Sequence, residues 1–131
     1  MESTMQVVRL GLNYERTRLE VATHNLAIAN VAHQSAESAQ KAVAHAPATS
    51  FANMLGSNAS TVEERLPAVK VVHDPGHPLA DQFGNVYFAS VDPPHEMATL
   101  VSATRAYEAN VRSFNTLMQM STKALEIGGR R

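Results

Sequence analysis

Apolar residues recur every seven positions through the last third of the chain. The spacings alternate between three and four positions, and the recurring residues are Met97, Leu100, Tyr107, Val111, Phe114, Met118 and Leu125. Thr104 and Ser121 fill the remaining places of the two rows. This alternation places side chains on one face of an α-helix, as in coiled coils. It therefore predicts a long amphipathic helix whose apolar seam must be buried against a partner.

A matching row lies near the N-terminus. Its leucines, spaced by seven, are Leu12, Leu19 and Leu26, and a second row of small or apolar residues between them is interrupted at Glu15. The pattern predicts an N-terminal helix that ends near residue 31. Heptads of this kind fit two interpretations equally well, namely an ordinary two-helix core and an assembly surface.

Between the two helices the pattern changes, and the chain divides into four segments of one structural unit. We expect an N-terminal axial helix over 1–31, a loop-rich variable segment over 32–67, a short strand and turn segment over 68–91, and a C-terminal axial helix over 92–131. The middle is rich in Ala, Ser, Asn, Gln and Thr. A short helix over 37–44 fits its alanines, and its one apolar cluster contains Phe51, Met54 and Leu55.

The strand and turn segment has clear local signals. Val69, Val71 and Val72 predict one strand over 68–73, and a second strand is expected over 85–89, so the two form a small hairpin with a wide connection. Turns are expected at 74–76 and 81–84, with an extended stretch over 77–79 between them. Asp92 and Pro93 then suit the N-cap and the first position of the last helix, and Gly128 with Gly129 suits its end.

Composition narrows the function classes. Of the 131 residues 44% are hydrophobic, but there is no Trp and only four Phe, so a core of large side chains would be thin and oligomerisation would add stability. The net charge of −1 and the absence of a basic cluster argue against nucleic acid or a membrane surface as partner. No apolar run is long enough to predict membrane insertion, and the N-terminus does not read as a secretory signal. The chain has no Cys, which excludes disulfides and thiol catalysis.

Candidate chemistry is sparse. His73, Asp74, His77 and Asp81 lie close in sequence, but the intervening prolines break any helical metal-ligand spacing, so we interpret them as parts of proline-braced turns. No nucleophile elbow, phosphate loop or paired carboxylates stand out. We therefore expect a protein that is not an enzyme and needs no metal or cofactor. The helix asparagines either face solvent or hydrogen-bond between helices and fix their register.

Several ordered motifs resemble those of bacterial flagellar rod and hook axial proteins, and in particular of proximal rod proteins of the FlgC type. The matching stretches read HNLAIAN at 24–30, DPGHPLAD at 74–81, SATRAYEANV at 102–111 and FNT at 114–116. Two features depart from the family pattern: Ile28 stands where Asn is usual, and the motif expected just after residue 30 is missing. The residues carrying the motifs are Asn25, Leu26, Asn30, Asp74, Pro75, Gly76, Pro78, Leu79, Asp81, Arg105, Tyr107, Asn110 and Asn115.

The resemblance implies a mainly α fold, with two long terminal helices in an antiparallel, coiled-coil-like pair. It also implies a structural subunit of the hollow flagellar rod that polymerises through those helices. The implied partners are other copies of the chain, neighbouring rod and rod-base proteins, and the flagellar type III export apparatus. The implied location is the basal body in the periplasmic space, reached without a cleaved signal peptide. The alternative from the residues alone is a helical adaptor that docks a partner helix on the C-terminal seam.

Overall fold

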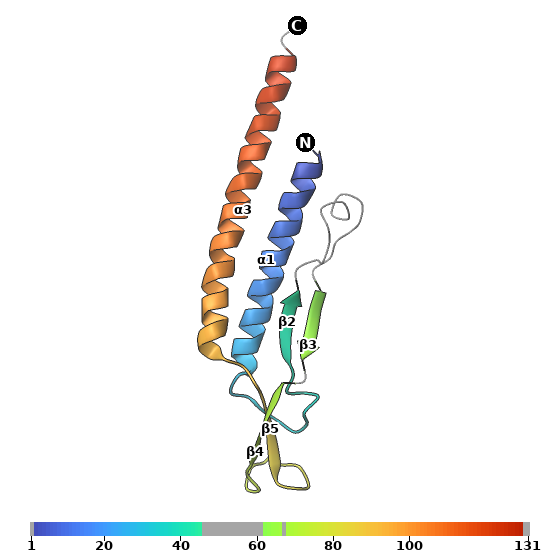
Figure 1. Ribbon diagram of the computed structural model, residues 1–131, viewed down its shortest axis with the longest axis vertical. Helices are drawn as coiled ribbons and strands as arrows, with labels where there is room; N and C mark the ends of the chain where they lie inside the picture. Colours follow the sequence, from blue (N-terminus) through green and yellow to red (C-terminus); the bar gives the residue numbers. More distant parts are fainter. Residues whose placement is uncertain (1, 46–61, 67, 130–131) are drawn as a thin grey trace.

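Two long helices dominate the molecule. The computed structural model describes residues 2–45, 62–66 and 68–129. Helix α1 spans Glu2–Ile28 and α3 spans Pro93–Gly128, and the two run side by side in opposite directions (Figure 1). The predicted fold class, a mainly α protein built on an antiparallel helix pair, is confirmed. Neither helix carries an apolar stretch long enough for a membrane span, as far as the described residues go.

Helix α3 begins and ends where its sequence signals predict. Asp92 is the N-cap residue, with a proline in the first turn, and its carbonyl accepts the amide of Glu96 at 3.0 Å. The Asp92 side chain makes no capping hydrogen bond, so Asp92 occupies the N-cap position without capping the helix through its side chain. At the other end the Gly129 amide donates to the Leu125 carbonyl at 2.9 Å.

A three-stranded antiparallel sheet lies at one end of the helix pair. Its order is β1 (Ala32–His33), β5 (Asn85–Ala89) and β4 (Val69–His73), and Val71 pairs with Tyr87 across β4 and β5. The hairpin expected from the valines and turn residues is therefore confirmed, and β1 is an unpredicted third strand.

The extended stretch expected over 77–79 is wrong, because the Ala80 amide donates to the His77 carbonyl at 3.0 Å and closes a turn there.

The middle segment contains strands that the sequence did not predict. Strands β2 (Lys41–His45) and β3 (Val62–Leu66) form an antiparallel pair, and β2 lies beside α1 (Figure 1). The short helix expected over 37–44 is wrong, because Ala39 and Ala42 are small enough to be fully buried as the chain passes close to α1. The predicted apolar cluster of Phe51, Met54 and Leu55 lies outside the described residues.

Two contacts fix the register of the helix pair. Asn25 meets Glu96, and a side chain added at Gly11 would meet Asn110, so the contacts lie fourteen residues apart on each helix. Continuing this register places residue 119 level with Glu2. Residues 120–128 of α3 therefore extend beyond α1 by about 13 Å, at 1.5 Å per residue, and the end of α3 stands clear of α1 in Figure 1.

The core is thin, as the composition predicts. Among the residues that the structure describes, the buried apolar side chains are alanine or valine, and they gather where the sheet-proximal half of the helix pair meets the strands. They are Val21, Ala22, Ala39, Ala42, Val86, Ala89 and Ala103.

Candidate assembly surface

Asn25 joins three elements at the base of the helix pair. Its side chain is 1% exposed and forms two hydrogen bonds with the backbone of Ala42 in β2, donating to the carbonyl at 2.8 Å and accepting from the amide at 2.9 Å. Its Nδ2 also donates to Oε1 of Glu96 in α3 at 3.1 Å. The carboxamide thus pairs with β2 as a neighbouring strand would. Of the two alternatives for the helix asparagines, hydrogen bonding between the helices holds for Asn25.

Glu96 takes a different role from the one its position suggests. At the first turn of α3 an anion is favoured by the helix dipole, and the sequence offers nothing more. The structure buries Glu96 to 8% exposure against Asn25. A buried carboxylate is costly unless it accepts hydrogen bonds, so Asn25 and Glu96 depend on each other.

Small residues set the closest approach of the two helices. The position of a Cβ at Gly11 would lie 3.1 Å from Nδ2 of Asn110, and Ala103 is fully buried on the same face of α3. Glycine and alanine leave room for α1 and α3 to pack without large side chains between them. The contact line of α3 therefore runs through Glu96, Ala103 and Asn110, beside the row of large apolar residues.

Glu15, which interrupts the second apolar row of α1, is nearly buried and paired. Its Oε2 lies 2.8 Å from Nη1 of Arg18, and the Arg18 guanidinium stands 5.7 Å from the centre of the Tyr14 ring. Both ion-pair partners are largely shielded from solvent. The ion pair with Arg18 offsets the charge of the Glu15 carboxylate where burial makes that charge costly.

The heptad seam of α3 is offset from the line that contacts α1. At about 100° per residue, Leu100, Val111 and Phe114 lie to one side of that line and are half-buried. The other seam residues extend further into solvent, with Tyr107 37%, Met118 46%, Met97 58% and Leu125 74% exposed. The seam is thus only partly covered by its own chain.

The leucine row of α1 lies on the same side of the pair. Leu12, Leu19 and Leu26 are offset from Gly11 in the same rotational sense as the α3 seam, and each is half-buried. Because the helices are antiparallel, equal offsets bring both rows to one side. Strand β2 covers the opposite side through Val21 and Asn25. The side with the apolar rows has no strand over it among the described residues.

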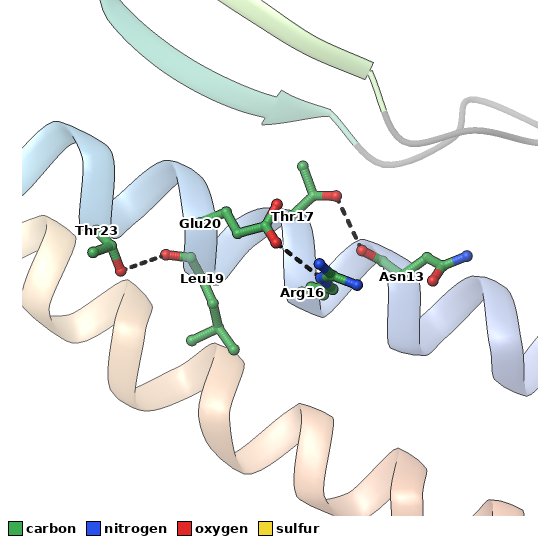
Figure 2. Close-up of polar contacts among 6 residues, drawn as sticks. All are labelled: Asn13, Arg16, Thr17, Leu19, Glu20 and Thr23. Atoms are coloured by element: carbon green, nitrogen blue, oxygen red, sulfur yellow. Dashed lines mark hydrogen bonds and ion pairs between the residues drawn. The ribbon is translucent and has the colours of Figure 1, made fainter.

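Figure 2 shows the polar face of α1 next to Leu19, whose side chain projects toward α3. Arg16 and Glu20 form an exposed ion pair at 2.8 Å, and this neighbour raises the pKa of Arg16. The hydroxyls of Thr17 and Thr23 donate to carbonyls one turn back, at 3.0 and 2.7 Å. Surface pairs of this kind contribute little to stability, so this face stays available to solvent or to a partner.

Asp81 organises the turns at the far tip of the sheet. Its Oδ1 accepts the amides of Phe83 and Asn85, both at 2.8 Å, and its Oδ2 accepts the Tyr87 hydroxyl at 2.8 Å. The Asn85 amide is the main cause that lowers the pKa of Asp81, and the bond to Asp81 raises the pKa of Tyr87. Gly84 closes the turn at φ +76°, and a Cβ there would lie 3.0 Å from Pro75. This network, with the turn bond from the Gly76 amide to Asp74, fixes the DPGHPLAD segment.

Several motif residues are exposed, whether or not they belong to this turn network. Asn30, Arg105 and Asn115 are exposed, as are Pro75, Gly76, Pro78 and Leu79. No group of three His, Asp or Glu side chains in the described ranges is placed to hold a metal ion. The sequence analysis lists Asn25 as a motif residue that could bond between helices, but it does not identify Glu96 as the partner.

The comparisons with known proteins agree with the motifs. A family model for the C-terminal region of the flagellar basal body rod proteins FlgEFG matches residues 84–127. This stretch contains β5 and almost all of α3. Over this stretch the chain is similar to rod proteins of the flagellar basal body.

Individual relatives narrow the class. The flagellar basal-body rod protein FlgC of Escherichia coli O6:H1 is 37% identical over 121 residues, which cover 90% of each chain. That of Salmonella typhimurium is 43% identical over 70 residues, covering 53% of this chain and 52% of the relative, so the match spans about half of that protein. That of Bacillus subtilis is 45% identical over 73 residues, covering 56% of this chain and 49% of the relative. The chain belongs to the family of flagellar basal-body rod proteins FlgC.

Proposed function

We propose that the chain is a structural, non-enzymatic subunit of the flagellar basal-body rod that polymerises through one side of its helix pair. Its partners are other copies of the chain together with neighbouring rod and rod-base proteins. Membership of the FlgC family supports the role as a rod subunit. The surface of the helix pair supports the proposed mode of assembly.

The observation that carries the proposal is the half-covered seam. Tyr107, Met118 and Leu125 expose 37%, 46% and 74% of their surface on the side where the leucine row also lies. A further helix laid along this side would bury both rows and remove apolar area from water at about 25 cal/mol per Å². Copies of the same terminal helices offer apolar rows with the matching seven-residue repeat.

The proposed location is the periplasmic part of the basal body, and the proposed route is the flagellar type III export apparatus, without a cleaved signal. The thin core supports this route. In the described part of the chain the buried apolar side chains are alanine or valine, so little apolar burial there opposes unfolding before passage. Assembly would then supply the missing burial.

A matched pair of variants tests the surface. Met118→Asp places a charge on the seam side, whereas Met120→Asp places it on the opposite flank of α3, where the side chain is 60% exposed. Both positions are exposed in the free chain, so both variants should fold. Burying an unpaired carboxylate in an interface costs several kcal/mol, so only Met118→Asp should prevent rod assembly.

The measurement is swimming, together with recovery of the chain in purified basal bodies, in a strain that lacks the native gene. Circular dichroism of each purified variant checks that helix content is unchanged. Normal swimming with Met118→Asp would contradict the seam assignment. A native chain that is absent from basal bodies and binds one soluble partner with fixed stoichiometry would instead support the adaptor alternative.

A further inference from the structure

An aromatic side chain is held in solvent at the tip of the sheet. Phe83 is 80% exposed, more than any other large apolar residue described. The turn that carries it is nonetheless rigidly specified, because Asp81 accepts the Phe83 amide and Gly84 adopts a positive φ. A preorganised turn that presents an exposed ring loses little entropy on binding. Aromatic side chains of this kind commonly anchor protein interfaces.

The same tip carries negative charge. The Asp81 carboxylate lies two residues from Phe83, and Asp74 stands exposed in the neighbouring turn. The one lysine of β4, Lys70, pairs with Phe88 at the end of the strand away from this tip. His77 lies between the two carboxylates in sequence, and its Nδ1 accepts the Leu79 amide at 3.1 Å. A partner for Phe83 should therefore combine apolar surface with a positive charge.

Such a surface exists on the outer face of α3. Met97 and Val101 are 58% and 54% exposed, and together with Arg105 they occupy successive turns of the helix. With Ala98 and Ser102 they line a shallow hollow that faces away from α1. We call it the α3 hollow. It shares only Met97 with the seam, and its other lining residues lie outside the seam. A contact centred on Val101 and Arg105 would therefore leave the rest of the seam free for helix packing.

We propose that Phe83 of one copy inserts into the α3 hollow of a second copy. The Met97 thioether and the Arg105 guanidinium both interact favourably with an aromatic ring, and Arg105 complements the carboxylates of the tip. The inference rests on the proposed function, since it concerns copies that assemble together. Tip and hollow are different surfaces, so the contact is heterologous and repeats from copy to copy as a filament requires.

Cysteine crosslinking tests the contact directly, because the native chain has no Cys. One chain carries Gln82→Cys, which leaves Phe83 intact, and a second carries Ala98→Cys in the hollow. Both are expressed together in a strain without the native gene, and purified basal bodies are treated with a short bismaleimide. The matched control replaces Ala98→Cys by Met120→Cys, an exposed position outside the hollow. Each single variant alone shows any crosslink between like positions.

We expect a chain dimer with the Gln82 and Ala98 pair at least fivefold more abundant than with the Gln82 and Met120 pair. Adding Phe83→Ala or Arg105→Glu should reduce it severalfold, and Arg105→Lys should retain part of it. Incorporation into basal bodies without this dimer would overturn the inference while leaving the proposed function in place. An adduct of Gln82→Cys with a different rod protein would overturn the choice of a second copy. Absence of the native chain from basal bodies would overturn both proposals.

Discussion

The two halves of the helix pair are packed very differently. In the half next to the sheet, Asn25, Glu96 and Ala103 are buried and strand β2 closes one side. In the half that carries the chain ends, no described residue of α1 before Glu15 is buried, and none of α3 after Ala103. The first half holds itself together within one chain. In the second half the apolar rows are in place, and no strand among the described residues covers them.

The difference indicates a division of labour along one pair of helices. The sheet-proximal half fixes register through specific polar contacts, since Asn25 bonds both β2 and α3. The distal half continues that register and exposes the apolar rows to a possible partner subunit. In the proposed assembly, a subunit built this way would have a defined shape beforehand and would gain most of its further burial from its neighbours.

Of the proposed changes, Asn25→Ala should lower the free energy of unfolding the most. The change removes three hydrogen bonds and leaves the Glu96 carboxylate and the Ala42 amide buried without this partner. Unpaired buried groups of this kind cost about 2–5 kcal/mol. Urea unfolding of the purified chain measures the loss.

Asn115→Ala is the matched control, because Asn115 is exposed in the distal half of α3. It should change the free energy of unfolding by less than about 0.5 kcal/mol. Equal losses at Asn25 and Asn115 would show that the two halves do not differ in packing.

Hydrogen exchange should reveal the same contrast without substitution. In the free chain, amides at 4–14 and 111–128 should exchange roughly 10 to 100 times faster than those at 18–26 and 96–106. A helix gains most of its stability from packing, and less packing permits local opening at lower free energy. In assembled basal bodies the distal amides should become the slower set. Equal protection of the two halves in the free chain would contradict the claim that the distal half is less well packed.

The smallest expected effect is the pH dependence of stability that Asp81 contributes at the tip of the sheet. The pKa of Asp81 is lowered in the folded chain from its ordinary value of 3.8. Its contribution to stability is therefore fully present above that ordinary value and is lost as the pH falls through the lower pKa of the folded chain. Asp81→Asn should flatten this acid dependence and loosen the turn around Phe83. The rate of hydrogen exchange at the Phe83 and Asn85 amides between pH 2 and 5 measures this acid dependence. Asp74→Asn, which keeps an acceptor for Gly76, should leave the exchange of these two amides largely unaltered.

The sequence predicts the long elements well and the contacts between them less well. The heptads locate both helices, and Asp92 with Pro93 sets the start of α3. The valines and turn residues locate the hairpin of β4 and β5. Strand β2 was not predicted because its alanines favour helix locally. The bond that secures it comes from Asn25, seventeen residues away.

The seam shows why large apolar rows do not identify the contact line between α1 and α3. They mark every surface that gains from burial, whether inside one chain or between chains. The line that meets α1 runs instead through Ala103 and Asn110, opposite Gly11. Periodicity of apolar residues gives these positions little weight. Only the register of the two helices, which depends on contacts far apart in sequence, separates one surface from the other.

The unequal lengths of the two helices also have a consequence for proteolysis. Beyond residue 119 the molecule narrows from two helices to one, and a single short stretch of helix with no neighbour is marginally stable in water. Lys123 lies in this stretch and is exposed. A protease that cleaves after lysine would therefore trim the free chain there first. Once a neighbouring subunit covers the narrow end, the same bond would resist cleavage, which makes it a convenient reporter of assembly.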